Sequence, residues 1–366
     1  MRDIYFVVHS LDEKNSGGVL KATTEIANKL SEEDISVKIV SLGNVEKLAF
    51  DTVPEVEIIT LAQKKYNTLF YKSIFKLIWF FQTFILLLAF TRKIDKSIFI
   101  ATSPPLCMLF GLIKIYHSQN KMFGWDHTST AYKSKGLVSI FKLYLYSKLD
   151  VFVALTPQDQ QYYQNKSVKA VYIPNGIKFI DVDSLVNNRK YLLYVGRFSS
   201  EKRPLLALDI YNQSKLWEKN IKFRMFGSGP LLDDILDYIE VHNLKSFVEI
   251  ISGINNPDVI YRDGYGLILT SSIEGFGLVL LEAVSRNIPC IAFDVPYGPR
   301  SIINNGLNGF LIPDNSTESA VELISNSLFK DLLNKDLSLS IKGYELSGIK
   351  SKWMEVLSKD FLEISE

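Results

Sequence analysis

The stretch "GLILTSSIEGFGLVLLEAVSRNIPCIAFD", residues 266–294, shows in miniature how this chain folds. Its two ends, "GLILTS" and "PCIAFD", are short apolar runs of the kind that form buried strands. Between them we expect a helix from about residue 277 to residue 286, opened by a glycine. A strand, a helix and a further strand in this order predict a unit of parallel α/β sheet.

The same alternation continues outward from this stretch. Before it we expect strands at "YLLYVG", "KFRMFG" and "FVEIIS", with helices near residues 204–217 and 231–242. The first half of the chain repeats the pattern, with strands at "IYFVV", "SVKIVSL", "SIFIATS", "KMFGWD", "DVFVALT" and "VKAVYIPNG". The fold class is therefore α/β, with two facing Rossmann-like, doubly wound domains that would hold a ligand in the cleft between their strand ends.

The length of 366 residues also favours two domains, each large enough to bury a core. We expect residues 1–176 to form the first domain and residues 190–340 the second. The polar and aperiodic stretch at residues 177–189 is the expected linker. The helical pattern at residues 341–366 predicts a last helix that packs back on the first domain.

The composition excludes several classes of function. With 41 basic and 40 acidic residues the chain has no overall field for binding nucleic acid, so an anionic ligand must be held locally. Its two cysteines, Cys107 and Cys290, lie far apart in apolar runs and indicate buried thiols in a reducing cytoplasm. The apolar run that begins at Ile4 is too short for a signal peptide and reads as a first buried strand.

The segment from Tyr71 to Lys93, "YKSIFKLIWFFQTFILLLAFTRK", is strongly apolar with basic residues at both ends. Polar residues divide it into runs shorter than the roughly 20 residues of a spanning helix. We favour a helix whose basic and aromatic face lies on an anionic membrane, as a peripheral contact. A spanning helix and an ordinary core helix are the alternatives.

Two cations follow the strand "YLLYVG", in the loop "RFSSEKRP". Arg197 offers a planar fork of donors and Lys202 a compact charge, and together at the carboxyl edge of a sheet they could grip a diphosphate. A solvated charged loop is the alternative reading.

Glycines mark two further turns between a strand and a helix. Gly17 and Gly18 precede a helix, where the backbone can approach an anion, although the dinucleotide order G-x-G-x-x-G is missing. Gly227, in "MFGSGPL", occupies a similar turn, for which a purely connecting role is the alternative.

Two glutamates stand out in the opening stretch. Glu274 lies on the loop after a strand, and Glu282 lies eight residues later, inside the following helix. The amides of Phe276, Gly277 and Leu278 at the start of that helix suit a phosphate. The two carboxylates could then accept hydrogen bonds from hydroxyls along one ligand; the alternative is a pair of exposed surface acids.

These motifs together resemble those of the family 4 retaining glycosyltransferases, which have a two-domain GT-B fold. The resemblance covers most of the chain and rests on the "GG" near the start, "IPNGI", "YVGRFSSEK", "FGSGPL", the E-x7-E pattern in "EGFGLVLLE", and "FDVPYGPRSIINNGLNGFLIP". The last block is similar to enzymes of bacterial surface-polysaccharide or teichoic-type glycan assembly.

The resemblance assigns roles to individual residues. It implies that Glu274 contacts the donor hexose, that Glu282 contacts the ribose, and that Arg197 and Lys202 hold the diphosphate with help from Gly18. It also places His127, in "FGWDHTST", near the sugar and the acceptor. A capping or packed loop histidine is the alternative reading for that residue.

The resemblance further implies a hexosyltransferase that needs no metal or other cofactor. "DVD", at Asp181 to Asp183, could be mistaken for a metal-binding motif, but it falls in the expected linker. We expect transfer of a hexose or N-acetylhexosamine from a nucleotide sugar, a UDP-sugar in the first instance, to a cell-surface glycan or lipid-linked acceptor at the cytoplasmic face of the membrane. A nucleotide-sugar epimerase and a non-catalytic partner subunit are the two alternatives.

Overall fold

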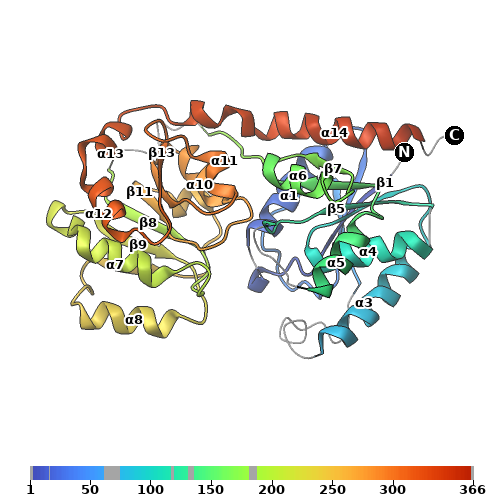
Figure 1. Cartoon of the computed structure of the whole chain (residues 1–366), viewed down its shortest axis with the longest axis horizontal. Coiled ribbons are helices and arrows are strands. Elements are labelled where there is room, and N and C mark those ends of the chain that lie inside the picture. Colours follow the sequence, from blue (N-terminus) through green and yellow to red (C-terminus); the bar gives the residue numbers. More distant parts are fainter. Residues whose placement is uncertain are drawn as a thin grey trace. The chain divides into compact units, whose positions relative to one another are not determined.

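The computed structural model describes residues 3–15, 17–61, 75–116, 119–130, 136–180 and 188–363. The chain divides into two compact units (Figure 1). The first contains residues 1–176 and 346–366, and the second is the continuous stretch 177–345. Residues 181–187 of the expected linker lie outside the described residues.

The first unit is built on a parallel sheet. Its elements are β1 (Asp3–Val8), a 3-10 turn (Glu13–Asn15), α1 (Gly18–Leu30), β2 (Ser36–Ser41), β3 (Val56–Thr60), α3 (Lys76–Thr91), β4 (Ile98–Ala101), α4 (Pro104–Tyr116), β5 (Lys121–Trp125), α5 (Leu137–Tyr146), β6 (Val151–Ala154), α6 (Pro157–Gln164), β7 (Ala170–Tyr172) and α14 (Leu346–Glu363). Among the described residues the strand order is β3-β2-β1-β4-β5-β6-β7, the doubly wound arrangement.

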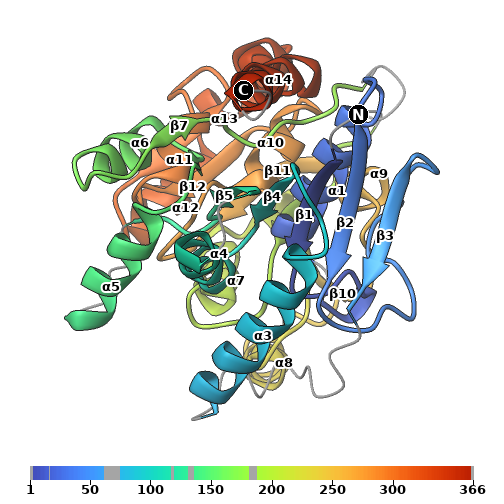
Figure 2. The same cartoon turned by 90° about the vertical axis from the view of Figure 1, so that its right-hand side faces the viewer.

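The helices of the first unit cover both faces of this sheet, with α1 and α14 on one and α4 and α5 on the other (Figure 1). Figure 2 shows β1, β2 and β3 side by side at the edge of the sheet. Strands β4 and β6 are buried along their whole length, which is why they read as unbroken apolar runs. The last helix is held by Trp353, whose ring packs edge-on against two others. The distance between ring centroids is 5.1 Å to Trp125 and 6.1 Å to Phe6.

The second unit repeats the arrangement on its own core. Its elements are β8 (Tyr191–Val195), α7 (Pro204–Ser214), a 3-10 turn (Leu216–Lys219), β9 (Lys222–Phe226), α8 (Leu232–Val241), β10 (Val248–Ile251), α9 (Pro257–Ile260), β11 (Gly264–Leu269), α10 (Leu278–Val284), β12 (Cys290–Phe293), α11 (Gly298–Ile302), β13 (Gly309–Ile312), α12 (Thr317–Ser325), α13 (Ser327–Leu332) and a 3-10 stretch (Ser338–Tyr344). The strand order in the described residues is β10-β9-β8-β11-β12-β13, and the described pairs are all parallel.

The prediction of two doubly wound α/β units is confirmed. The sequence pattern missed several elements, however, among them α4 and β3 in the first unit and β13 in the second. Helix α4 begins with two prolines and is apolar on every side, so it shows no helical alternation of apolar and polar residues. Strand β3 is a half-exposed edge strand of only five residues, too short for a clear period.

Candidate active site

Glu274 is buried in the second unit, on the loop between β11 and α10. It is only 6% exposed, and its backbone pairs with Tyr297 in an isolated parallel bridge. Its Oε1 atom accepts hydrogen bonds from Lys202 Nζ at 2.6 Å and from Ser271 Oγ at 2.6 Å. A buried carboxylate loses its hydration and needs an ion pair and hydrogen bonds, which Glu274 has. The reading of Glu274 as an exposed surface acid is therefore wrong.

Lys202 reaches Glu274 from the loop that follows β8. The backbone of this loop is tied down, because Thr270 Oγ1 donates to the carbonyl of Lys202 at 3.1 Å and Tyr194 Oη donates to that of Arg197 at 3.1 Å. The Lys202 side chain forms an ion pair with Glu274 and is 28% exposed, whereas Arg197 is exposed to solvent. Two cations therefore lie on one tethered loop at the carboxyl edge of the second sheet.

Gly227 lies where the loops after β8 and β9 touch. A Cβ atom at Gly227 would come within 2.0 Å of the carbonyl oxygen of Gly196, so a side chain there would push the two loops apart. The contact is reinforced by hydrogen bonds from the Phe198 amide to the Ser228 carbonyl and from the Leu231 amide to the Phe198 carbonyl. Gly227 thus has a packing role in shaping this edge.

The start of α10 has the backbone geometry that its glycine predicts. Gly277 has a φ of 90°, in the left-handed region, and directly precedes the first helical residue, Leu278. The preceding Phe276 is buried, and Gly298 packs so closely on its backbone that a Cβ there would lie 2.4 Å from the Phe276 carbonyl oxygen. These contacts leave little space around the short turn between Glu274 and α10.

Glu282 is also buried, on α10, but it has different partners from Glu274. It is 5% exposed, and its Oε2 atom accepts a hydrogen bond from Tyr261 Oη at 2.6 Å. Burial raises the pKa of Tyr261 well above its usual value, and the nearby Glu282 raises it further, so the phenol stays a donor. The reading of Glu282 as an exposed acid is therefore wrong as well.

His127 lies in the first unit, two residues after β5. Its ring packs against Trp125, with 4.3 Å between the ring centroids, and its buried Nε2 atom has no hydrogen-bond partner in the described part of the chain. Burial lowers the pKa of His127 to about 4, although the adjacent Asp126 opposes the change. A neutral imidazole with one unpaired nitrogen can exchange a hydrogen bond with a ligand.

Asp126, which sequence reasoning missed, fixes the loop that carries His127. Its Oδ2 atom accepts from Tyr146 Oη at 2.9 Å and from Lys142 Nζ at 3.1 Å, and its Oδ1 atom accepts from Thr128. Both donors on the Oδ2 side come from α5. The signal for this residue was an acid directly after a buried strand, in "FGWDH".

A second residue that sequence reasoning missed, His9, follows β1. Its Nε2 atom lies 2.8 Å from Ser103 Oγ, and its ring packs against Trp79 of α3 with 5.5 Å between the ring centroids. Burial lowers the pKa of His9 to about 4. Its position directly after the first strand was the available signal.

Gly17 and Gly18 lie at the start of α1. Gly17 is exposed, and a Cβ atom at this position would meet no other atom within 4 Å. Packing therefore does not account for glycine at position 17. An open helix start is compatible with a bound anion, but no contact in the unit selects one.

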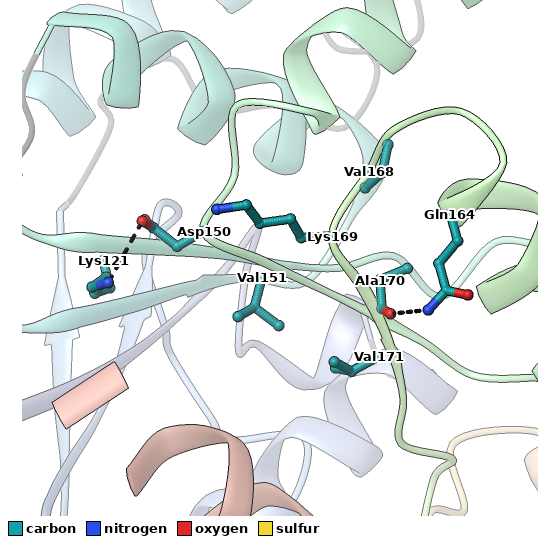
Figure 3. A pocket seen from close by; sticks show the side chains of 8 residues that line it. All are labelled: Lys121, Asp150, Val151, Gln164, Val168, Lys169, Ala170 and Val171. Carbon is teal, nitrogen blue, oxygen red and sulfur yellow. Dashed lines mark hydrogen bonds and ion pairs between the residues drawn. The ribbon is translucent and has the colours of Figure 1, made fainter. Parts of the chain in front are cut away.

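A metal site has no support in the described residues, where no group of three or more His, Cys, Asp or Glu side chains could hold an ion. Asp181 and Asp183 lie outside those residues. A pocket of about 360 Å³ lies at the amino ends of β5, β6 and β7, whereas His127 follows the carboxyl end of β5. Figure 3 shows the side chains that line this pocket. Its acid, Asp150, is already paired with Lys114 at 2.8 Å, so the pocket does not extend the candidate site.

The apolar segment from Tyr71 to Lys93 is described only from residue 75 onward, mainly as α3. Within the described residues, no helix has the length and apolarity needed to cross a bilayer. Four residues of α3 are buried, Trp79, Thr83, Leu87 and Thr91, so the helix is only partly a core helix.

Comparison with known proteins adds independent information. Residues 177–344 match the family described as glycosyl transferases group 1. The chain is 25% identical to the GalNAc-alpha-(1->4)-GalNAc-alpha-(1->3)-diNAcBac-PP-undecaprenol alpha-1,4-N-acetyl-D-galactosaminyltransferase of Campylobacter jejuni, over 98% of this chain and 99% of that protein. It is also 25% identical to the amylovoran biosynthesis glycosyltransferase AmsD of Erwinia amylovora, over 94% of this chain and 97% of that protein.

The fold has solved counterparts too. The crystal structure of the pneumococcal O-GlcNAc transferase GtfA in complex with UDP and GlcNAc matches with a TM-score of 0.81, over 98% of this chain and 99% of that chain. Sequence identity in this match is 15%, so the likeness concerns the fold alone.

Proposed function

Because this chain is a glycosyltransferase with the GT-B fold, whose residues 177–344 match glycosyl transferases group 1, we propose that it is a retaining hexosyltransferase of the family 4 type. Its donor is a nucleotide sugar, in the first instance a UDP-sugar, carrying a hexose or N-acetylhexosamine. Its acceptor is a lipid-linked or polymeric cell-surface glycan. The Campylobacter jejuni relative, named as an N-acetyl-D-galactosaminyltransferase and for an undecaprenol-linked glycan, supports this choice of sugar and acceptor.

The observation that carries the proposal is the ion pair between Lys202 and the buried Glu274, on a loop that also carries Arg197. All three charged residues lie on loops at the carboxyl edge of the second sheet, where ligands of doubly wound sheets bind. Glu274 is proposed to accept hydrogen bonds from the donor hexose. Lys202 and Arg197 are proposed to stabilise the negative charge that develops on the diphosphate.

Other residues of the second unit are proposed to contact the nucleotide part of the same donor. Glu282, oriented by Tyr261, is proposed to accept hydrogen bonds from the ribose hydroxyls. The amides of Phe276, Gly277 and Leu278 are proposed donors to phosphate oxygens, and Gly227 keeps the neighbouring loop in shape. In the first unit, the backbone at Gly17 and Gly18 is proposed to contact the diphosphate, and His127 to contact the sugar and the acceptor.

In the proposed reaction the bond between the anomeric carbon and the diphosphate oxygen breaks, and its electron pair stays on that oxygen. The acceptor hydroxyl attacks the oxocarbenium-like carbon from the same face and loses its proton to the departing phosphate. Lys202 and Arg197 balance the phosphate charge, so we propose that transfer needs no bound metal. Full activity after treatment with a chelator is the expected result; loss of activity that added Mg²⁺ restores would contradict this part.

The enzyme is proposed to act at the cytoplasmic face of the membrane, where a lipid-linked acceptor presents its sugar. The basic and apolar segment from Tyr71 to Lys93 supports this location as a peripheral contact. Both cysteines are buried free thiols, as suits a reducing compartment.

The test is transfer by the purified full chain with a panel of UDP-sugars, first scored by thermal shift and UDP release. The productive donor is then combined with lipid-linked acceptors, and the anomeric configuration of the product is determined by NMR. Retention of configuration is expected, together with at least a 100-fold loss of rate in Lys202→Ala. An inverted product would refute the retaining mechanism, and epimers formed without acceptor would favour the epimerase alternative.

A further inference from the structure

Helix α3 has an apolar outer face as well as an apolar inner face. The buried side is the i, i+4 stripe from Trp79 to Thr91. On the other side large apolar residues face solvent. Leu77 is 71% exposed and Ile85 is 65% exposed, and Ile78 and Phe81 are exposed as well. A helix that rests on a core and faces water normally has polar residues at these positions.

Helix α5 repeats this anomaly. Leu145 and Tyr146 are buried on its inner side, but Leu137 is 83% exposed and Ile140 is 66% exposed. Val138, Phe141 and Tyr144 are exposed too. Neither helix therefore has the outer surface of a helix that remains in water.

The two helices belong to one surface of the first unit. Helix α4 contacts both α3 and α5, and Figure 2 shows α4 between them. The end of α4 adds Tyr116, which is exposed and lies edge-on to Phe84 of α3 at 6.1 Å. We use the name apolar face for the exposed apolar side chains of the two helices. They are Leu77, Ile78, Phe81 and Ile85 of α3, and Leu137, Val138, Ile140, Phe141 and Tyr144 of α5.

The charges around the apolar face are mostly of one sign. Helices α3, α4 and α5 contain no aspartate or glutamate. Lys76 begins α3, Arg92 and Lys93 follow it, and all three are exposed. The first acid after α3 is Asp95.

We propose that the apolar face lies in the headgroup layer of an anionic lipid bilayer, with α3 and α5 parallel to the membrane plane. The sixteen residues of α3 place its two cationic ends roughly 24 Å apart, which suits a continuous anionic surface better than a single acidic site on a protein. This inference widens the contact proposed for the Tyr71–Lys93 segment to a second helix. It can be tested whether or not the proposed sugar transfer is correct.

The inner sides of the same helices contact residues of the candidate site. Trp79 of α3 packs against His9, and Lys142 and Tyr146 of α5 donate hydrogen bonds to Asp126, next to His127. A membrane that holds the outer side of α5 therefore also holds the helix that positions the His127 loop.

The experiment is flotation of the purified full chain with vesicles of phosphatidylcholine, with and without phosphatidylglycerol. The wild type should float with the mixed vesicles, and raised salt or removal of phosphatidylglycerol should weaken binding. Phe81→Ser with Ile85→Ser on α3, or Ile140→Ser with Phe141→Ser on α5, should each lower the partition coefficient on the order of tenfold. All four changes together should lower it about a hundredfold.

The matched control is Val241→Ser with Leu339→Ser, which removes two exposed apolar side chains from the second unit and should leave flotation unchanged. Thermal unfolding and donor binding should be unaltered in every variant, which separates lost membrane binding from misfolding or a failed donor site. The proposal is overturned if the wild type ignores anionic vesicles, or if the α3 and α5 variants float like the wild type. It is equally overturned if these substitutions instead dissociate a dimer in solution.

Discussion

Replacing Lys202 by alanine tests whether its ion pair with the buried Glu274 serves catalysis or only stability. The substitution leaves the Glu274 carboxylate, 6% exposed, with Ser271 as its remaining side-chain donor among the described contacts. A lost hydrogen bond to a charged group costs about 1.5–3 kcal/mol. Because the Lys202 side chain is 28% exposed and water can partly replace it, we expect a loss of about 2 kcal/mol in the free energy of unfolding.

The effect on transfer should be larger than the effect on stability. If Lys202 stabilises the departing diphosphate, its loss should lower kcat/KM by about 10²–10³-fold. Adding Glu274→Gln removes the unpaired charge, so the double variant should regain about 1 kcal/mol of stability relative to additivity. Its activity should not return, because neither group is then present to act on the donor.

The assays are urea unfolding and initial rates of UDP release, each on the wild type, both single variants and the double variant. The matched control is Lys245→Ala, which breaks an exposed pair with Glu240 at 3.0 Å and should leave activity intact, with at most about 1 kcal/mol of stability lost. A folded Lys202→Ala enzyme with a wild-type rate would refute the phosphate assignment. Strictly additive stabilities would refute the energetic coupling of the pair.

Three further predictions concern stability. In the folded state the pKa of His127 is about 4, below its ordinary value of 6.5, so the unfolded chain takes up the proton first as the pH falls. The free energy of unfolding should therefore decrease between pH 6.5 and pH 4, by up to about 3 kcal/mol from this group. Urea unfolding of His127→Gln should show a smaller decrease over the same range. Asp126→Asn removes the partner of Lys142 and should cost about 3 kcal/mol in urea unfolding, while an unchanged midpoint would contradict the role given to Asp126. Gly227→Ala should cost about 1–3 kcal/mol, seen as a lower Tm, since its Cβ would meet the Gly196 carbonyl; a wild-type Tm would mean that the two loops can separate freely.

The sequence predicted the positions of Glu274, Arg197 and Lys202 at one sheet edge because that position follows from local pattern. Each residue lies on a loop that follows an apolar strand, and the carboxyl ends of parallel strands share an edge. The residue roles taken from the glycosyltransferase resemblance stay predictions until variants are assayed.

The partners of these residues could not be predicted in the same way. Lys202 and Glu274 are 72 positions apart, and nothing local specifies that their side chains meet. Tyr261 reaches Glu282 from beside α9, a helix of one turn without a readable period. Asp126 looked like any acid at a strand end, since its importance arises from donors that α5 supplies. Such pairings depend on tertiary packing, which a single sequence does not display.

The place of α14 in the first unit has a consequence for how the protein is made. The first unit needs Trp353, which is fully buried and packs on Phe6 and Trp125, yet this residue is synthesised after the whole second unit. Residues 177–345 form a continuous stretch that can fold as it leaves the ribosome, while residues 1–176 must wait for their last helix. The half of the enzyme that begins the chain is therefore the half completed last, and a chain cut short before residue 346 would leave Trp125, the neighbour of His127, without its cover.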